Sequence, residues 1–175
     1  MRTNLLSTIH VRTRPGTRAR GWLIAGSLAI PVALGRAGIR ANKREGDGGT
    51  PRGRFRLLRL WWRADRGPRP RTLLPVRRIG KNDGWCEEPA DRRYNRPVSM
   101  RGRAGDRLWR DDCLYDFIVE IDHNTRPRVA GRGSAVFIHV ARPGFAPTAG
   151  CVALDSNHLK SLLERVGPRT RIVIQ

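Results

Sequence analysis

A histidine and a cysteine that lie twelve positions apart could act as a base and a nucleophile. His139 lies in the apolar run 137–140, and Cys151 follows Gly150. An imidazole within hydrogen-bond reach of a thiol can take its proton and leave an ion pair that attacks a carbonyl carbon. The spacing has little weight by itself, because a lone histidine and a lone cysteine often serve only as core residues.

The segment between these two residues contains strong turn formers. Residues 133–140 read as a buried strand that ends at His139, and prolines and glycines interrupt residues 141–150. Such a segment turns sharply, so it can bring Cys151 back beside the end of the strand. Gly150 lets the backbone approach a bound substrate, and N–H groups near Cys151 can hold a developing oxyanion, which is worth about 3–4 kcal/mol per donor.

Further motifs occur along the chain. They are ALGRAGIR (33–40), KREGDGGTPRG (43–53), WC (85–86), YNRPV (94–98), LYD (114–116) and the block 139–154. In this order they resemble the YkuD-type L,D-transpeptidase family, bacterial enzymes that act on peptidoglycan. The resemblance extends from about residue 21 to residue 174. Because it rests on several separated motifs, it is far more specific than the His/Cys pair.

The resemblance implies a fold and a reaction. The fold is mainly β, a catalytic β-sandwich with one C-terminal helix packed on the sheet. Cys151 is implied as the nucleophile and His139 as the base, with Thr148 and Gly150 in the loop before the cysteine. We expect the Val140 carbonyl to orient the imidazole.

In the implied reaction, the thiolate attacks the carbonyl of the L-centre in a tetrapeptide stem. The terminal D-alanine leaves and a thioester acyl-enzyme forms. An amine from a second stem then gives a cross-link, whereas water gives L,D-carboxypeptidase hydrolysis. This chemistry needs no metal and no organic cofactor.

Two further motifs are candidates for the substrate cleft at the edge of the sheet. Their polar residues are Lys43, Glu45, Asp47, Tyr94, Asn95 and Arg96. A charged turn and a packed strand end would explain the same residues without a role in binding.

Two positions depart from the family's motif. Ala149 stands where the family has a histidine, and Ala153 stands where it has an arginine or asparagine. The upstream histidine is the family's base, so the core chemistry is retained, but the acyl acceptor and the preferred stem stay open.

These changes also favour one alternative, a catalytically silent basic binding domain. A two-barrel cysteine protease is a further alternative, although it would normally have an acidic residue between the histidine and the cysteine, and a longer chain.

The charge of the chain limits its partners. The 175 residues have a formal net charge of +20, and three of the 35 basic residues are lysines, which leaves 32 arginines. Such a charge attracts polyanions, including nucleic acid, anionic lipid headgroups and acidic cell-wall stems. The basic residues are spread along the chain without a nucleic-acid-binding motif. We therefore expect peptidoglycan stem peptides as the partner and no specific nucleic acid.

Cys86 and Cys113 lack the spacing of a zinc site.

The N-terminal part of the chain decides the domain organisation. Residues 1–20 have few apolar side chains and predict a disordered basic arm, which leaves 21–175 as the catalytic domain. Residues 21–34 superficially resemble a signal peptide, but Gly26, Ser27 and Pro31 interrupt them, so we expect strands there.

No stretch approaches the roughly 20 apolar residues of a transmembrane helix. The resemblance implies the bacterial cell envelope as the location of the protein, whereas the lack of a clear signal peptide leaves a cytoplasmic location open.

Further strands are expected near 54–62, 114–122, 134–140 and 171–175, and a helix is expected around His158, opened by Asp155 or Ser156.

Overall fold

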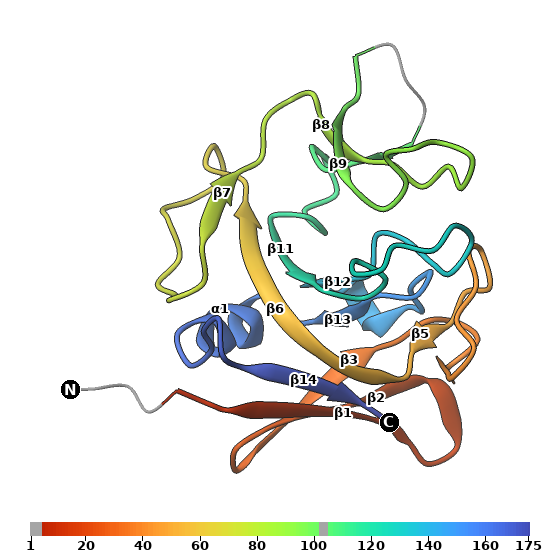
Figure 1. The fold of residues 1–175 in the computed structure, drawn as a ribbon. Coiled ribbons are helices and arrows are strands. Elements are labelled where there is room, and N and C mark those ends of the chain that lie inside the picture. The colour runs from red at the N-terminus through yellow and green to blue at the C-terminus, as the bar shows by residue number, and fades with distance from the viewer. Residues whose placement is uncertain (1–4, 102–104) are drawn as a thin grey trace.

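Strands dominate the fold. The structure, a computed structural model, describes residues 5–101 and 105–175. The strands of this described part are β1 (Thr8–Arg14), β2 (Thr17–Ala25), β3 (Leu28–Ala33), β4 (Ile39–Arg40), β5 (Thr50–Pro51), β6 (Gly53–Trp62), β7 (Val76–Arg78), β8 (Asp83–Trp85), β9 (Pro97–Ser99), β10 (Asp106–Arg107), β11 (Phe117–Ile121), β12 (Phe137–Val140), β13 (Val152–Leu154) and β14 (Arg171–Ile174). The described residues also form one α-helix, α1 (Ser156–Leu163), and one 3-10 turn, η1 (Pro143–Phe145) (Figure 1).

The main sheet closes on itself. Its strands follow the order β11-β12-β13-β3-β2-β1-β14-β6-β7, and β11 pairs with β6 as well as with β12. The extra pairing makes a barrel-like ring, and β7 extends it through β6. For the described residues, the mainly β character and the single C-terminal helix are confirmed. Where two sandwiched layers were expected, the strands form one closed sheet.

The helix packs against the core of this ring. Its N-terminal N–H groups are capped by Asp155, whose Oδ1 accepts from Asn157 (2.9 Å) and His158 (3.2 Å). The leucines of α1 join the same buried cluster as the aliphatic side chains of the barrel strands. These leucines are Leu159, Leu162 and Leu163. The N-cap and the apolar stripe of the helix therefore agree with the sequence prediction.

The N-terminal segment differs from the expected disordered arm. Residues 8–14 form β1, which pairs antiparallel with β2 and parallel with β14. Ile9 and Val11 are fully buried in the barrel core. The alternation of these two side chains with polar neighbours explains the strand. The prediction of disorder was wrong because it relied on composition, and arginines and threonines surround the two apolar residues. Residues 1–4 of the predicted arm lie outside the described residues.

Deletion of residues 1–20 is expected to give insoluble protein. It removes β1 and residues 17–20 of β2, so it opens the ring between β2 and β14 and uncovers apolar core. Solubility and circular-dichroism melting would be compared with those of Arg14→Ser, which changes an exposed side chain of the same strand. A soluble truncated protein with a cooperative melting transition would contradict this expectation.

The apolar stretch 21–34 forms strands, as predicted. It contains most of β2 and all of β3, which pair antiparallel across a turn at Gly26, where φ is 66°. Leu23, Val32 and Leu34 are fully buried. No helix of the described residues is long and apolar enough to cross a membrane.

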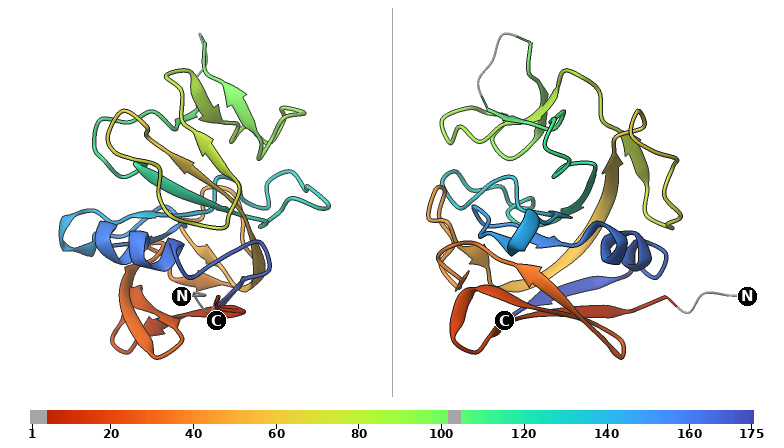
Figure 2. Two further views of the ribbon diagram at one scale, coloured as in Figure 1. Left: turned by 90° about the vertical axis from the view of Figure 1, so that its left-hand side faces the viewer. Right: turned by 180° about the vertical axis from the view of Figure 1, so that it is seen from behind.

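A small sheet lies over one end of the ring. It consists of β10, β8 and β9, in this order, and Figures 1 and 2 show it beyond β11 and away from β1 and β14. A second buried cluster includes Trp85 and Leu108 of this region and Phe137 of the main sheet. Cys151 belongs to the same cluster. The packing of the small sheet on the ring therefore surrounds the predicted nucleophile.

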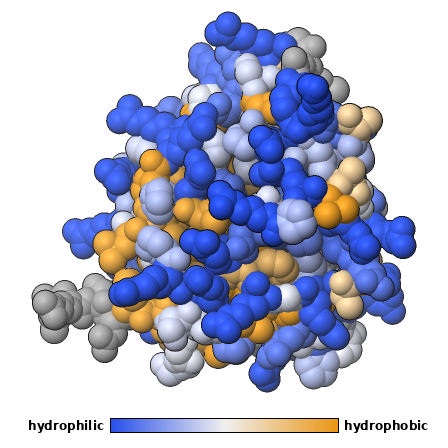
Figure 3. Space-filling model, viewed as in Figure 1, coloured by the Kyte–Doolittle hydropathy of each residue, from blue (hydrophilic) through white to orange (hydrophobic). Residues whose placement is uncertain are grey.

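Charged side chains cover much of the surface. Figure 3 shows hydrophilic residues around smaller hydrophobic patches on one face. Several arginines pair with nearby carboxylates, among them Arg63 with Asp65 (2.8 Å) and Arg66 with Asp116 (2.8 Å). The chain has 35 basic and 15 acidic residues, so basic side chains outnumber acidic ones by 20. The surface therefore favours contact with anionic material.

Candidate active site

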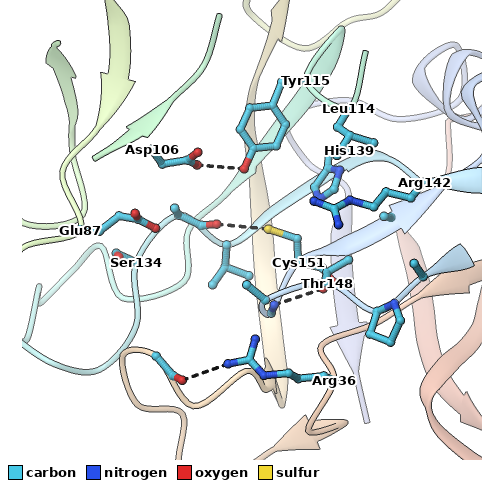
Figure 4. A pocket seen from close by; sticks show the side chains of 18 of the residues that line it. Arg36, Glu87, Asp106, Leu114, Tyr115, Ser134, His139, Arg142, Thr148 and Cys151 are labelled. Carbon is cyan, nitrogen blue, oxygen red and sulfur yellow. Dashed lines mark hydrogen bonds between the residues drawn. The ribbon is translucent and has the colours of Figure 1, made fainter. Parts of the chain in front are cut away.

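The predicted nucleophile and base line one cavity of about 490 Å³. Its walls come from the 43–46 loop, the small sheet, the segments 110–115 and 134–136, strand β12 and the loop 142–151. Figure 4 shows the labelled side chains of His139, on β12, and of Cys151, just before β13, directed toward this space. The full lining set is Arg36, Lys43, Glu45, Gly46, Glu87, Asp106, Arg110, Leu114, Tyr115, Ser134, Ala135, Val136, His139, Arg142, Ala146, Pro147, Thr148, Ala149, Gly150, Cys151 and Ala153.

Strand pairing brings the two residues together. Strand β12 lies parallel to β13, with Ile138 opposite Val152 and His139 opposite Ala153. Cys151 directly precedes β13. The loop with η1 returns the chain to this side of the sheet, as its prolines and glycines predict. Both side chains are buried, with exposed fractions of 7% for His139 and 8% for Cys151.

The backbone fixes the tautomer of His139. Its Nδ1 lies 2.9 Å from the carbonyl oxygen of Val140. Because a carbonyl can only accept, Nδ1 carries the proton and the lone pair is on Nε2. Burial lowers the pKa of His139 to about 4, and the charges of Arg110 and Arg142 act in the same direction, against the Val140 hydrogen bond. At neutral pH the imidazole is therefore uncharged and able to accept a proton.

The thiol of Cys151 is bonded to the backbone of the neighbouring segment. Its Sγ donates to the Ala135 carbonyl (3.2 Å) and accepts from the Phe137 N–H (3.3 Å). Burial raises the pKa of Cys151 to about 12, although the Phe137 N–H opposes this shift. The resting site thus contains a neutral thiol and a neutral imidazole, in place of the ion pair expected from the sequence. Desolvation disfavours both charges.

Asn95 supports Ala135, whose carbonyl accepts the hydrogen bond from the Cys151 thiol. Ala135 has a φ of 50°, a left-handed conformation that is strained for alanine. Its N–H donates to Asn95 Oδ1 (3.2 Å), which also accepts from Trp85 Nε1 (2.9 Å). The Asn95 amide in turn donates to the carbonyls of His123 (3.1 Å) and Asn124 (2.9 Å). Asn95 therefore belongs to the scaffold below the cavity and not to its lining.

The loop before the cysteine is held by Thr148. Its Oγ1 donates to the Cys151 carbonyl (2.7 Å) and accepts from the Gly150 N–H (3.1 Å). Its backbone exchanges hydrogen bonds with the 34–36 segment, from Thr148 N–H to Leu34 (2.9 Å) and from Arg36 N–H to Thr148 (3.0 Å). The ALGRAGIR motif thus anchors the nucleophile loop.

Gly150→Ala is expected to destabilise the site. Gly150 has a φ of 151°, and a Cβ there would lie 2.8 Å from the carbonyl oxygen of Gly49. Strain of this kind costs about 1–3 kcal/mol, before the backbone clash is added. Gly144→Ala is the matched control, because Gly144 has a φ of 71° with no atom within 4 Å of a built Cβ. Melting temperature and Cys151 alkylation rate would be measured, and equal losses in the two variants would contradict the role of the Gly49 contact.

The other predicted cleft residues divide into lining and support. Lys43 and Glu45 line the cavity. Asp47 lies behind Lys43 and accepts from its Nζ (2.5 Å). Burial acts to raise the pKa of Asp47, but hydrogen bonds from Lys43 and from the backbone outweigh it and lower the pKa. Tyr94 donates to Glu45 from behind the wall.

Arg96 does not reach the cavity. Its side chain is exposed, and its backbone carbonyl accepts from the Cys86 N–H (2.9 Å). Val140 takes part through its carbonyl, and its side chain packs against the barrel core.

Sequence reasoning missed the charged walls of the cavity. Glu87 and Asp106 lie on the side of the small sheet, and Arg110, Arg142 and Arg36 contribute positive charge. Desolvation, together with the charges of Asp106 and Glu45, raises the pKa of Glu87 to about 7. Burial also raises the pKa of Asp106. Very short strands with no apolar periodicity position the two acids, so the sequence contained no signal for them.

Tyr115 was also missed as a lining residue. The LYD motif contained it, but nothing in the sequence indicated that its ring contacts His139. Among the residues that the structure describes, no group of three or more His, Cys, Asp or Glu side chains is placed to hold a metal ion.

Comparison with known proteins gives one family. The model of the YkuD family, described as the L,D-transpeptidase catalytic domain, matches residues 11–174. The match begins within β1, in agreement with the place of this strand in the sheet. Comparisons with curated proteins and with solved structures give no match.

Proposed function

Because the chain belongs to the YkuD family of L,D-transpeptidase catalytic domains, we propose that it is a cysteine-dependent L,D-transpeptidase that acts on peptidoglycan tetrapeptide stems. The family implies an L,D-transpeptidase-type enzyme and a peptidoglycan substrate. The observation that carries the finer proposal is the shared cavity of Cys151 and a neutral His139 with a free Nε2.

The first half-reaction transfers the acyl group to sulfur. As Sγ of Cys151 attacks the carbonyl of the L-centre, the thiol proton passes to Nε2 of His139, and a carbon–sulfur bond forms. The Val140 carbonyl stabilises the imidazolium through Nδ1–H. Arg110 and Arg142 disfavour that cation, so the proton moves readily to the leaving nitrogen. The carbon–nitrogen bond breaks and D-alanine departs as the amine.

The tetrahedral intermediate needs donors for its oxyanion. N–H groups of Gly150 and Cys151 are our candidates, because they belong to the nucleophile and to the residue before it. The Gly150 N–H contacts Thr148 Oγ1 at 3.1 Å, so it would be shared between the hydroxyl and the substrate oxygen. In the substrate-free site this donor is therefore engaged by Thr148, and the oxyanion would have to share it.

The second half-reaction depends on the acceptor. An amine from a second stem attacks the thioester, gives its proton to His139 and forms the cross-link, while the thiol is regenerated. The carboxyl groups of Glu87 and Asp106 lie at the wall of the cavity, and an ammonium group on the way to its reaction would favour their charged forms there.

Hydrolysis is the second candidate outcome. Ala149 and Ala153 both line the cavity, where the family's motif has larger polar side chains. Their methyl groups leave space near the thioester and no side-chain group to hold an acceptor. Water could then take the place of the amine and give L,D-carboxypeptidase activity.

Incubation of the purified protein with a disaccharide-tetrapeptide tests the proposal by mass spectrometry. A cross-linked dimer that lacks one D-alanine supports transpeptidation, and a disaccharide-tripeptide supports hydrolysis. Cys151→Ser is the control for contaminating enzymes. An unchanged substrate after long incubation with folded protein would refute both reactions and favour a binding domain.

A further inference from the structure

Tyr115 lies between the candidate base and the small sheet. Its ring meets the imidazole of His139 edge to face, with centroids 5.3 Å apart and an interplanar angle of 75°. On the other side its hydroxyl donates to Asp106 Oδ2 (2.8 Å), as Figure 4 shows. Asp106 belongs to β10 of the small sheet. One side chain thus connects an element of the small sheet to the catalytic strand β12.

The imidazole needs a second restraint besides its backbone bond. The Val140 carbonyl holds Nδ1, but a single hydrogen bond leaves the ring free to tilt about it. General-base catalysis requires Nε2 to be aimed at the thiol within hydrogen-bond reach. An aromatic ring packed against the imidazole removes this freedom. Tyr115 is the ring that occupies this position.

Tyr115 is itself held on several sides. Phe137 packs against it edge to face at 6.2 Å, and the Arg110 guanidinium lies 5.0 Å from its ring centroid. Arg110 also reaches Asp106 (3.9 Å), so the cation and the carboxylate support each other around the phenol. Burial and the nearby Asp106 raise the pKa of Tyr115, so the hydroxyl keeps its proton and remains a donor.

We propose that Tyr115 is a positioning residue for His139 and that Asp106 fixes its orientation from the small sheet. The inference rests on the proposed function, because it gives His139 the role of base. It assigns to the small sheet a part in the chemistry, since movement of β10 would release Tyr115 and with it the imidazole.

The test compares the alkylation of Cys151 at pH 7 and pH 10 in the full chain. Tyr115→Leu removes the ring and should slow alkylation about tenfold at pH 7 but no more than about twofold at pH 10, where hydroxide can deprotonate the thiol. Tyr115→Phe keeps the ring and should lose about twofold to threefold at pH 7. Trp109→Leu is the matched control, because Trp109 packs against the same buried cluster but does not line the cavity.

Asp106→Ala tests the anchor. It removes the same hydrogen bond as Tyr115→Phe, so the double variant Asp106→Ala/Tyr115→Phe should react no more slowly than the slower single variant. Additive losses would overturn the anchoring role of Asp106. Equal slowing of Tyr115→Leu at both pH values would overturn the positioning role and indicate damaged structure.

A parallel measurement on His139→Ala separates this inference from the proposed function. If His139→Ala slows alkylation at pH 7 and Tyr115→Leu does not, the positioning role alone is wrong. If neither variant affects the rate at pH 7, the assignment of His139 as base is wrong. The positioning role of Tyr115 is then wrong as well.

Discussion

Cys151→Ser is expected to abolish acyl-enzyme formation while the fold persists. The hydroxyl can keep the bonds to the Ala135 carbonyl and the Phe137 N–H, so the buried packing changes little. A serine hydroxyl is a much weaker nucleophile than a thiol beside the same base, and loss of a nucleophile can reduce turnover by about a thousandfold or more. Intact-mass detection of a carbapenem adduct is the measurement, with a melting curve to confirm folding.

The other two cysteines provide the controls. Cys86 is buried, Cys113 is exposed, and neither lines the cavity of Cys151. Cys113→Ser should form the adduct at the rate of the unmodified protein. An adduct that forms equally well on Cys151→Ala would show that another residue is the nucleophile.

His139→Ala should change the pH dependence of the thiol. In the unmodified protein the imidazole can accept a proton at every pH above its pKa of about 4. Alkylation of Cys151 should therefore stay nearly constant from about pH 5 to pH 9 and fall in stronger acid, where His139 becomes charged. In the variant, the thiol must lose its proton to solvent, and its pKa of about 12 makes the rate rise about tenfold per pH unit.

The difference between the two proteins is thus largest near neutrality. We expect a loss of about a hundredfold at pH 7 and a much smaller loss at pH 10. Alkylation is followed by peptide mass mapping, so that the other thiols do not contribute. His158→Ala is the control, because this side chain is half exposed at the start of α1. Parallel pH profiles for His139→Ala and the unmodified protein would exclude the role of base.

Local signals in the sequence were sufficient for the centre of the site. An apolar run predicted β12 up to His139, and the glycines and prolines after it predicted the turn that returns Cys151. The helix after Asp155 followed from an N-cap and an apolar stripe. Each of these features depends on neighbours within about one turn or one strand, so the residues themselves contain the information.

Features that depend on distant partners could not be predicted. Asn95 supports Ala135, 40 positions away, through a hydrogen bond that no local pattern indicates. Glu87 and Asp106 reach the cavity because the small sheet packs over it. For the same reason, Asp47 and Tyr94 could be recognised as belonging near the site but not as supports of Lys43 and Glu45. The strand β1 was missed because its two core residues lie among arginines and threonines.

The pairing of β1 with β14 affects how the chain reaches its fold. Residues 8–11 lie beside residues 171–174, so the ring cannot close until its most distant segments have met. The entropy cost of closing a loop rises slowly with its length, and a high contact order is associated with slow folding. During synthesis on the ribosome, the strand that contains Ile9 and Val11 cannot pair with β14 until β14 has been synthesised. Until then the apolar side of the first hairpin is open to solvent and to chaperones.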